Sequence, residues 1–164
     1  MERFCRSEIV VPCNTQQIFL GRDTVAFDFS HCMAKLIIYT DSMSCSSCQI
    51  DHMYEYQEMI DFRSETGEKY LPVFIFSPRK GQGDNIRYTL SITRFRYPVL
   101  LDEAGGLPRL NPHIPSDNRF HAFLLDKNGK VVLVGNPSRN PALWELYKKT
   151  IIDLIGNDGI LPEK

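Results

Sequence analysis

Apolar residues along the chain gather into two runs that predict strands buried on both faces. Residues 34–40 are apolar at almost every position, and residues 71–76 repeat that pattern. A strand that packs on one face alternates apolar and polar side chains, whereas a strand that is covered on both faces is apolar throughout. We therefore expect residues 34–40 to lie inside a sheet.

Between and after these runs, apolar positions recur at three- and four-residue steps, which predicts helices. The first helix begins at Cys45 and ends near Glu65. A second helix is expected over residues 84–95 with Asp84 as its cap, and a closing amphipathic helix over residues 141–155. Strands and helices thus alternate along the chain, which is typical of βαβ units.

Shorter segments predict the rest of the sheet. Residues 97–102 form a short strand, and residues 120–134 form a hairpin whose turn holds Asn128 and Gly129 as left-handed positions. The stretch at 103–118 is rich in glycine and proline, so we expect it to be irregular. A small antiparallel extension precedes residue 34. Its three apolar segments are residues 9–12, 17–20 and 25–29, with a turn at residues 21–23.

No linker, internal repeat or change of composition divides the 164 residues, so we expect one domain. Residues 1–33 would form the N-terminal β-hairpin extension, and residues 34–155 the core. The order of elements predicts the α/β fold class, with a central mixed β-sheet flanked by helices.

Composition and charge exclude several classes of protein. With 43% apolar and 24% charged residues, the chain matches ordinary globular proteins rather than disordered or fibrous ones. Its 19 basic and 20 acidic residues are spread along the chain, so no basic stripe for nucleic acid is present. Arginines and aromatic residues do mix between Arg87 and Tyr97, which we interpret as a helix with a solvated face that runs into a strand. No apolar run approaches the roughly 18 residues that cross a bilayer.

Among the five cysteines, only Cys45 and Cys48 have a spacing that indicates a chemistry. They enclose Ser46 and Ser47 at the point where a buried strand turns into a helix. Helix N-terminal N–H groups stabilise a thiolate, and such pairs lower the pKa of the outer thiol from ~8.5 to between ~3.5 and ~7.5. A thiolate of this kind attacks a disulfide, and a second thiol resolves the mixed disulfide. The sequence predicts Cys45 as the attacking sulfur and Cys48, one turn further in, as the resolving sulfur.

Several motifs occur in an order that is itself informative. A strand at residues 35–40 leads to the cysteine pair, a second strand follows at residues 97–102, and a hairpin spans residues 123–132 with Gly135 after it. This order resembles the thioredoxin superfamily, and it is most similar to the exported thiol-disulfide oxidoreductases and the alkyl-hydroperoxide-reductase-like branch. The resemblance covers roughly residues 34 to 155 and implies a thioredoxin-like fold.

The same resemblance implies a function and a place in the cell. Cys45 and Cys48 would exchange disulfides with protein thiols and disulfides, and a separate thiol donor, rather than a dissolved cofactor, would recycle them. The implied location is the cell envelope or periplasm, with a signal or lipid anchor outside this chain. A cytoplasmic location stays open, because residues 1–13 lack the apolar stretch of a secretion signal.

Two parts of the expected docking surface depart from the family pattern. The family places a cis-proline six residues before the aspartate that matches Asp126, where this chain has Phe120, and the nearest proline is Pro115. Either Pro115 takes that place in a longer loop, or the docking edge is absent. A non-proline cis bond costs ~3 kcal/mol, so we expect Phe120 to be trans. A tryptophan often precedes the cysteine pair, whereas this chain has Met43 and Ser44.

Other uses of the cysteine pair stay open. A zinc site needs two further ligands, and we interpret His52 as a solvated surface histidine rather than one of them. A copper(I) site would add a distant histidine, for which His113 and His121 are the candidates, although copper proteins of this fold usually place three residues between their cysteines. We predict no metal and no cofactor. The remaining alternative is a non-catalytic binding or redox-sensing module with a structural disulfide.

The remaining candidates concern proton transfer and the other thiols. Asp41 is first of all a turn former, and with Glu55 it is a candidate to assist proton transfer near the cysteine pair. We expect Trp144 to pack the closing helix. Cys5 and Cys13 would close a small disulfide in an exported protein, or would stay free thiols like Cys32.

Overall fold

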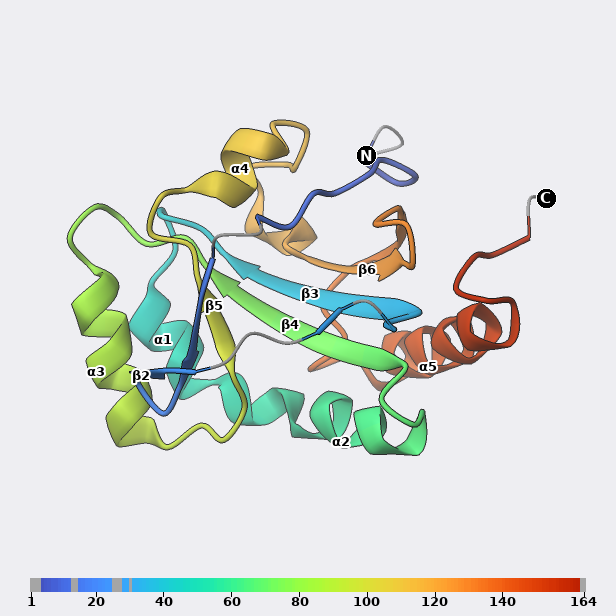
Figure 1. Cartoon of the computed structure of the whole chain (residues 1–164), viewed down its shortest axis with the longest axis horizontal. Helices are drawn as coiled ribbons and strands as arrows, with labels where there is room; N and C mark the ends of the chain where they lie inside the picture. The colour runs from blue at the N-terminus through green and yellow to red at the C-terminus, as the bar shows by residue number, and fades with distance from the viewer. Residues whose placement is uncertain (1–3, 13–14, 25–27, 30, 163–164) are drawn as a thin grey trace.

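The computed structural model describes residues 4–12, 15–24, 28–29 and 31–162. Within them, seven strands form one mixed sheet in the order β2-β1-β5-β4-β3-β6-β7 (Figure 1). The strands are β1 (Gln16–Phe19), β2 (Arg22–Asp23), β3 (Ala34–Thr40), β4 (Tyr70–Phe76), β5 (Val99–Leu101), β6 (Ala122–Asp126) and β7 (Val131–Val134). Strands β3, β4 and β5 are parallel, and the other pairings are antiparallel.

Helices cover both faces of this sheet, as the apolar runs predict. They are α1 (Ser46–Asp51), the 3-10 helix η1 (Met53–Tyr56), α2 (Gln57–Glu65), α3 (Gly83–Thr93), α4 (Gly106–Leu110), the 3-10 helix η2 (Asn118–Phe120) and α5 (Pro141–Gly156). In Figure 1, α4 and the N-terminal segment lie above the sheet, and α2 and α5 lie below it. The predicted α/β arrangement with a flanked central sheet is therefore confirmed.

Strand β3 separates two apolar cores. Leu36 and Ile38 belong to the larger core, which α1, α2, α3 and α5 cover. Ile37 and Tyr39 belong to the smaller core, which α4 and the N-terminal segment cover. Successive side chains of a strand point to opposite faces, so a strand between two cores must be apolar throughout. The loop that leads to Cys45 thus starts from a strand that packing fixes on both sides.

Strand β4 contains Pro72 although it lies inside the sheet. A proline removes a ladder hydrogen bond and is normally confined to edge strands. Here β5 pairs only with the last three residues of β4, from Phe74 onward, so Pro72 faces no strand on that side. Its carbonyl oxygen instead accepts a hydrogen bond from the Tyr97 hydroxyl at 2.7 Å. A half-paired strand thus accommodates the proline.

The first predicted helix is divided into three parts. After α1, the backbone leaves helical geometry at His52 (φ −101°, ψ 2°) and continues through η1 into α2. A 3-10 helix has three residues per turn, so residues three apart share one face. Met53 and Tyr56 are the two buried residues of η1, and this spacing directs both toward the sheet.

The second helix, α3, begins at Gly83, so the prediction that Asp84 caps it is wrong. Gln82, whose backbone is already close to helical (φ −96°, ψ −1°), occupies the cap position. Asp84 lies in the first turn, where its charge still favours the helix dipole. Of the arginines between Arg87 and Tyr97, Arg94 and Arg96 are exposed just after α3, whereas Arg87 on α3 is half-buried and pairs with Asp23.

The prediction of irregular structure at 103–118 is wrong for α4. The buried Asp102 carboxylate accepts hydrogen bonds from the Gly106 and Leu107 N–H groups at 2.8 and 2.9 Å, which starts α4. It also accepts one from the Ser77 hydroxyl at 2.7 Å. Pro108 stands in the first turn, where a helix does not need its N–H. A long-range side-chain contact therefore creates this helix.

The predicted N-terminal extension is confirmed in β1 and β2, which form a hairpin beside β5. Strand β2 occupies part of the predicted turn, because the chain already reverses at Leu20 and Gly21. The expected strand at residues 9–12 is wrong. Of the expected segment at 25–29, residues 25–27 lie outside the described residues, and residues 28–29 are not in a strand.

The predicted hairpin of β6 and β7 and the closing helix α5 are confirmed, but β6 begins at Ala122, because residue 120 belongs to η2. Asp126 Oδ1 accepts hydrogen bonds from the N–H groups of Asn128 and Lys130 in the turn. Of the two residues expected in left-handed conformation, only Gly129 has it (φ +84°). Trp144 packs α5 as expected, and its ring meets Phe62 edge to face.

Candidate active site

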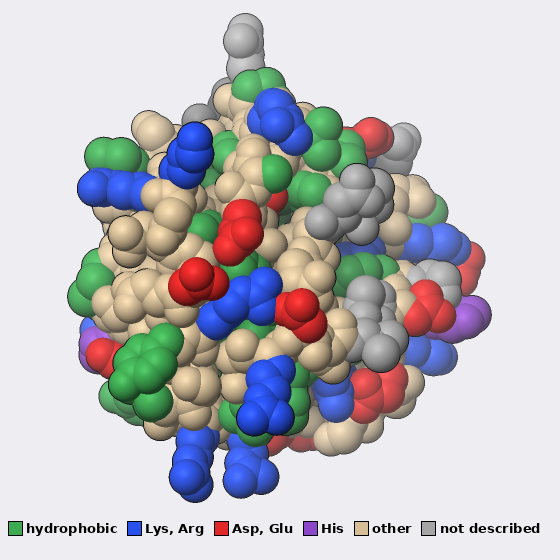
Figure 2. All heavy atoms as spheres, turned by 60° about the vertical axis from the view of Figure 1, so that its left-hand side comes forward, with side chains coloured by type: hydrophobic (Ala, Val, Ile, Leu, Met, Phe, Trp, Pro, Cys, Tyr) green, Lys and Arg blue, Asp and Glu red, His purple; other side chains and the backbone are tan. Residues whose placement is uncertain are grey.

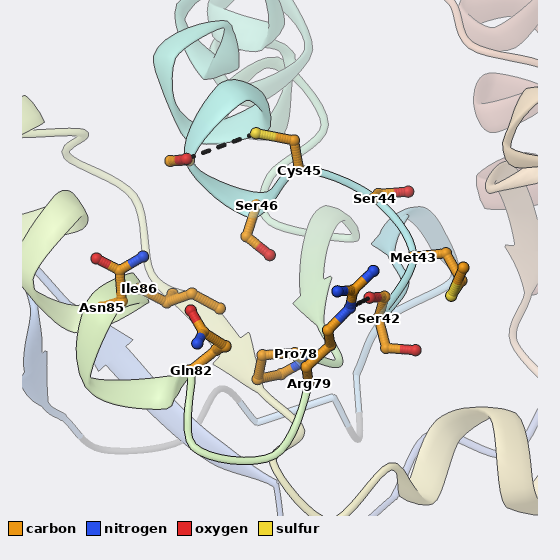
Figure 3. A pocket seen from close by; sticks show the side chains of 11 residues that line it. Ser42, Met43, Ser44, Cys45, Ser46, Pro78, Arg79, Gln82, Asn85 and Ile86 are labelled. Atoms are coloured by element: carbon orange, nitrogen blue, oxygen red, sulfur yellow. Dashed lines mark hydrogen bonds between the residues drawn. The ribbon is translucent and has the colours of Figure 1, made fainter.

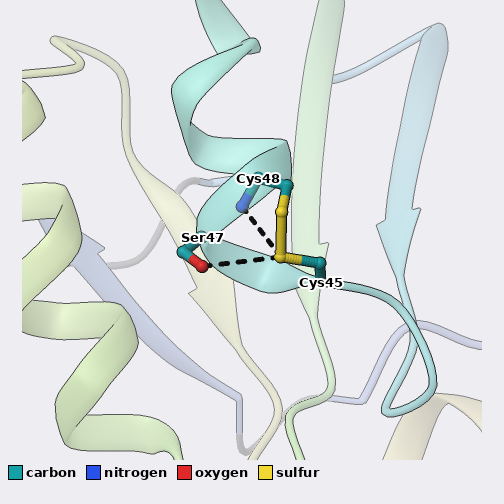
Figure 4. The surroundings of a disulfide bond; sticks show 3 residues. All are labelled: Cys45, Ser47 and Cys48. Atoms are coloured by element: carbon teal, nitrogen blue, oxygen red, sulfur yellow. Dashed lines mark hydrogen bonds between the residues drawn. A yellow bond between two sulfur atoms is a disulfide. The ribbon is translucent and has the colours of Figure 1, made fainter.

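The cysteine pair lies at the start of α1, after the loop of residues 41–44 that follows β3. Cys45 is the N-cap residue of α1, and Cys48 stands three residues later in the first turn. The two form a disulfide with their Cα atoms 5.3 Å apart (Figure 4). Both residues are exposed. The structure therefore brings the two predicted site residues together at the surface.

Asp41 folds the loop that leads into the pair. Its Oδ1 atom accepts hydrogen bonds from the Met43 and Ser44 N–H groups at 3.1 and 2.9 Å, and from the Ser44 hydroxyl at 2.7 Å. An aspartate that binds the backbone two or three residues ahead closes an Asx turn. The interpretation of Asp41 as a turn former is confirmed, and the turn fixes where Cys45 enters the helix.

The sulfur of Cys45 is aligned with the helix terminus. The Cys48 N–H donates to Cys45 Sγ at 3.3 Å, and the Ser47 hydroxyl lies 3.5 Å from the same sulfur (Figure 4). Positive hydrogen-bond donors near a sulfur stabilise its anionic form more than its neutral form. The local geometry is therefore suited to hold a negative charge on Cys45 after reduction.

Cys48 is less buried than a position further into a helix suggests. Ile50 is the buried residue of α1, at 3% exposure. Cys48 precedes it by two residues, which is a rotation of about 200° on a helix with 3.6 residues per turn. Cys48 therefore faces away from the core, and Asp41 and Glu55 have no buried thiol to serve there.

The segment that enters β6 differs from a cis-proline loop. No cis peptide bond occurs in the described part of the chain, so Phe120 is trans, as expected, and Pro115 does not supply a cis bond. His121 lies between η2 and β6, and its carbonyl oxygen accepts a hydrogen bond from the Tyr39 N–H. Its ring lies 4.9 Å from that of Tyr39. The alternative in which Pro115 supplies the cis-proline of a docking edge is therefore wrong.

His121, one of the two histidines considered for copper, is buried beside this site and hydrogen-bonded. It is only 5% exposed, and its Nε2 lies 2.7 Å from the Pro115 carbonyl oxygen. The buried Nδ1 has no hydrogen-bond partner among the described residues and lies 3.9 Å from Asp41 Oδ2. Its place directly before an apolar strand is the signal in the sequence that favours burial.

Glu55 is held in an ion pair rather than poised as a base. Arg139 donates two hydrogen bonds to its carboxylate, at 2.7 and 2.9 Å, and His52 Nδ1 lies 3.3 Å away. The Arg139 hydrogen bonds, together with its charge, lower the pKa of Glu55. A carboxylate with a lowered pKa is a weaker proton acceptor. The confirmed surface position of His52 is part of the same network.

This ion pair gives a direct titration prediction. In the Arg139→Gln variant the cation that favours the Glu55 carboxylate is gone, so the pKa of Glu55 should rise toward its ordinary value. Carboxyl ¹³C NMR of a pH series measures this shift. Arg119→Gln is the matched control, because Arg119 pairs with Asp117 instead and should leave Glu55 unchanged. An identical Glu55 titration in the Arg139 variant would contradict the ion pair.

The two histidines considered for copper each contact a backbone carbonyl. His113 Nε2 lies 3.0 Å from the Glu8 carbonyl oxygen, and His121 contacts Pro115 as described above. Within the described residues, no three side chains of histidine, cysteine, aspartate or glutamate come together as a metal-binding group. The structure therefore does not join either histidine to the cysteine pair in one ligand set.

Two further cysteines carry free thiols. Cys32 is buried, its S–H donates to the Ala34 carbonyl oxygen, and burial raises the pKa of this thiol. Cys5 is half-buried. Cys13 lies outside the described residues, so the predicted Cys5–Cys13 disulfide stays a prediction. A raised pKa keeps Cys32 protonated, so it does not compete with Cys45 as a thiolate.

Comparisons with known proteins place this geometry in a fold. No protein-family model matches the sequence, and no curated protein matches it either. Among solved structures, the chain is similar to the thioredoxin domain of a thiol-disulfide oxidoreductase from Bacteroides vulgatus, with a TM-score of 0.58 and 16% identity over 90% of this chain and 97% of that one. The chain has a thioredoxin-like fold. The fold implied by the order of motifs is confirmed.

Two other similar structures agree with this assignment. An uncharacterized conserved protein from Geobacillus kaustophilus has a TM-score of 0.59 and 16% identity, over 98% of this chain and 87% of that one. A thioredoxin-like protein solved in its oxidized form has a TM-score of 0.53 and 14% identity, over 94% and 98%. At these identities the likeness shows the thioredoxin-like fold alone. Among the described residues, no helix is long and apolar enough to cross a membrane.

Proposed function

We propose that this protein exchanges disulfides with protein substrates, with Cys45 as the attacking thiol and Cys48 as the resolving thiol. The observation that carries the proposal is an exposed Cys45–Cys48 disulfide at the first turn of a helix in a thioredoxin-like fold. The pair is open to a partner, and its outer sulfur already accepts a helix N–H. These are the two requirements for a reactive thiol pair.

In the reductive direction, the reduced cysteine pair supplies both electrons and both protons that the substrate disulfide takes up. The Cys45 thiolate attacks one sulfur of a substrate disulfide, so a Cys45–substrate bond forms and the other substrate sulfur leaves as a thiolate. The Cys48 thiolate then attacks Cys45 Sγ, which releases the second substrate thiolate and forms the Cys45–Cys48 disulfide. Two electrons pass to the substrate, and the two protons of the reduced pair follow. The oxidative direction is the reverse.

The proposal includes partners and a compartment. A thiol donor must return two electrons to the oxidised pair in each cycle, because no electron source lies within the pair itself. The motif resemblance to exported oxidoreductases supports a cell-envelope location. The similar Bacteroides vulgatus structure is the domain of a protein named as a thiol-disulfide oxidoreductase, which also supports protein disulfides as substrates.

The reduction potential of the pair tests the proposal. We expect a reversible couple between about −270 mV, the value of a thioredoxin, and about −120 mV, that of a strong oxidant, because both ends of this range belong to exchange-active pairs. Equilibration in glutathione or dithiothreitol buffers, followed by alkylation and mass spectrometry, measures it. A disulfide that these buffers leave closed in the folded protein would instead support a non-catalytic module.

A further inference from the structure

We propose that a cavity beside Cys45 binds an acidic side chain next to the reacting cysteine of the substrate, with Arg79 as the residue that recognises it. This inference rests on the proposed function and adds a substrate class to it. The cavity has a volume of about 450 Å³ and lies between the loop before α1 and the loop that leads into α3 (Figure 3). Ligand pockets typically span about 300–1,000 Å³, so it is large enough for a bound side chain.

The cavity is directly continuous with the proposed nucleophile. Cys45, Ser46 and Ser47 are among its lining residues, and in Figure 3 Arg79 and Gln82 stand across the cavity from Cys45 and Ser46. When a substrate cysteine is bonded to Cys45, the substrate chain extends away from it in two directions, and one of these directions leads into the cavity. Because consecutive residues of an extended chain advance by about 3.3 Å, it is the residues next to the substrate cysteine that reach this cavity.

Arg79 is held in place for this role. Its Nε–H donates to the Ser42 carbonyl oxygen at 2.9 Å, which joins the α3 loop to the loop that carries Cys45. In Figure 3 its guanidinium group points toward that loop at the cavity edge. Among the described residues Arg79 takes part in no ion pair within 4 Å, and its terminal N–H groups make no hydrogen bond there. An arginine anchored through Nε presents its other donors to a carboxylate.

The residues that line the cavity favour a negatively charged side chain over a positively charged one. Its polar members are serines, Gln82 and Asn85, and Arg79 is the charged residue among the lining residues. The carboxylates of Asp84 and Glu103 line a separate cavity, of which Arg79 is also a lining residue. A carboxylate in the first cavity therefore meets a cation and neutral donors, whereas a lysine there meets neutral acceptors but is repelled by Arg79.

The preference is local rather than a property of the whole surface. Figure 2 turns the left-hand side of Figure 1 toward the viewer and shows acidic and basic side chains interspersed over that face. The whole chain carries a net charge of only −1. A long-range field that steers acidic substrates needs one sign of charge to dominate, so any selection must come from the contact with Arg79.

The test measures how fast Cys45 reacts with matched peptides. The probes are three peptides that differ only in the residue next to their cysteine, Glu, Gln or Lys, each activated as a mixed disulfide with 2-thiopyridine. In the full-length Cys48→Ser protein, the Cys45 thiolate attacks the peptide sulfur, the old disulfide breaks, and 2-thiopyridine leaves and takes up the proton. Its absorbance gives the rate constant. The Cys45→Ser/Cys48→Ser double variant measures the reaction of the other thiols.

We expect the Glu peptide to react about threefold faster than the Gln peptide, and the Lys peptide about threefold slower, after division by the rate of each peptide with free glutathione. This is the size of an exposed ion pair. Adding Arg79→Gln should bring the three rates together, whereas Lys80→Gln, on the neighbouring residue outside this cavity, should preserve the order. Salt at 0.5 M should compress the order as well.

Two results separate this inference from the function on which it rests. If the order is the same in the Arg79→Gln and Lys80→Gln variants, or if the Lys peptide reacts fastest, the acidic-substrate inference is wrong even when the wild-type protein reduces insulin normally. If glutathione and dithiothreitol buffers leave the Cys45–Cys48 disulfide closed in the folded wild-type protein, the proposed function is wrong. A charge order that depends on Arg79 supports the assigned cavity in either case.

Discussion

The Cys45→Ser protein should lose all catalysis of insulin disulfide reduction and leave only the background rate of dithiothreitol. Serine is nearly isosteric with cysteine, but its hydroxyl is not a nucleophile toward disulfides at neutral pH. Cys45 is the sulfur that accepts the Cys48 N–H, so its removal takes away the thiol that the helix stabilises. The turbidity of precipitating insulin B chain, followed with catalytic amounts of protein, measures the loss.

The Cys48→Ser protein should behave differently, because the first step survives in it. Cys45 still attacks the substrate, but no second thiol releases the mixed disulfide. Mass spectrometry of the non-reduced protein should show an added insulin chain, bound through a peptide that contains Cys45. Cys32→Ser is the matched control, since its thiol is buried and protonated, and it should keep wild-type turnover.

Retained activity in both cysteine variants would contradict the assignment of this site. If the Cys45→Ser protein forms an adduct on Cys48 as fast as the Cys48→Ser protein forms one on Cys45, the two cysteines exchange their proposed roles. The experiment must test this outcome, because both cysteines are exposed in the disulfide form and a substrate can reach either sulfur. The asymmetry that favours Cys45 is the N-cap position of its sulfur, which Cys48 does not share.

The sequence predicts the core of the fold well because local patterns carry it. Strand β4 is apolar throughout and β3 is apolar except at Lys35 and Thr40, and strands of this kind are found inside a sheet that is covered on both faces. The closing helix follows from one apolar stripe, and the cysteine pair follows from its spacing at a strand-to-helix turn. Each of these features is encoded within fewer than twenty neighbouring residues.

The features that the sequence did not predict depend on contacts between distant residues. The expected strand at 9–12 fails because Val10 binds the Asn111 side chain, which accepts from its N–H and donates to its carbonyl oxygen, both at 2.8 Å. A side-chain amide thus replaces a neighbouring strand, 101 residues away in sequence. Asp102 starts α4 in the same manner. Neither partner is visible in a local pattern.

The candidate site divides along the same line. The pairing of Cys45 with Cys48 and the turn at Asp41 are local, and both predictions are confirmed. The position of Arg79 beside the cysteine loop is not local, because it depends on a hydrogen bond to Ser42 across 37 residues. Substrate selection is therefore the part of the function for which the structure adds most to the sequence.

The second large effect concerns the aromatic cluster beneath the site. Phe74 on β4 is 1% exposed, and its ring makes edge-to-face contacts with Tyr56, Phe95 and Tyr97 at 5.4, 5.4 and 5.7 Å between ring centres. Replacing a buried phenylalanine by alanine removes apolar burial and leaves a cavity, which costs about 3–5 kcal/mol. Domains of this size are stable by only about 5–15 kcal/mol, so Phe74→Ala should remove a large part of the total.

Urea unfolding of the oxidised protein, followed by circular dichroism, measures the change in the free energy of unfolding. Tyr88→Ala is the matched control, since this aromatic residue is 65% exposed on α3 and should change stability by less than about 0.5 kcal/mol. If Phe74→Ala does not fold, Phe74→Leu keeps most of the volume and should cost about 1–1.5 kcal/mol.

Because Tyr56 belongs to η1, losing its contact with Phe74 should loosen the segment behind α1 first. Faster amide exchange in η1 than in α5 would show that the cluster anchors the cysteine helix to the sheet, and equal loss in both would refute it.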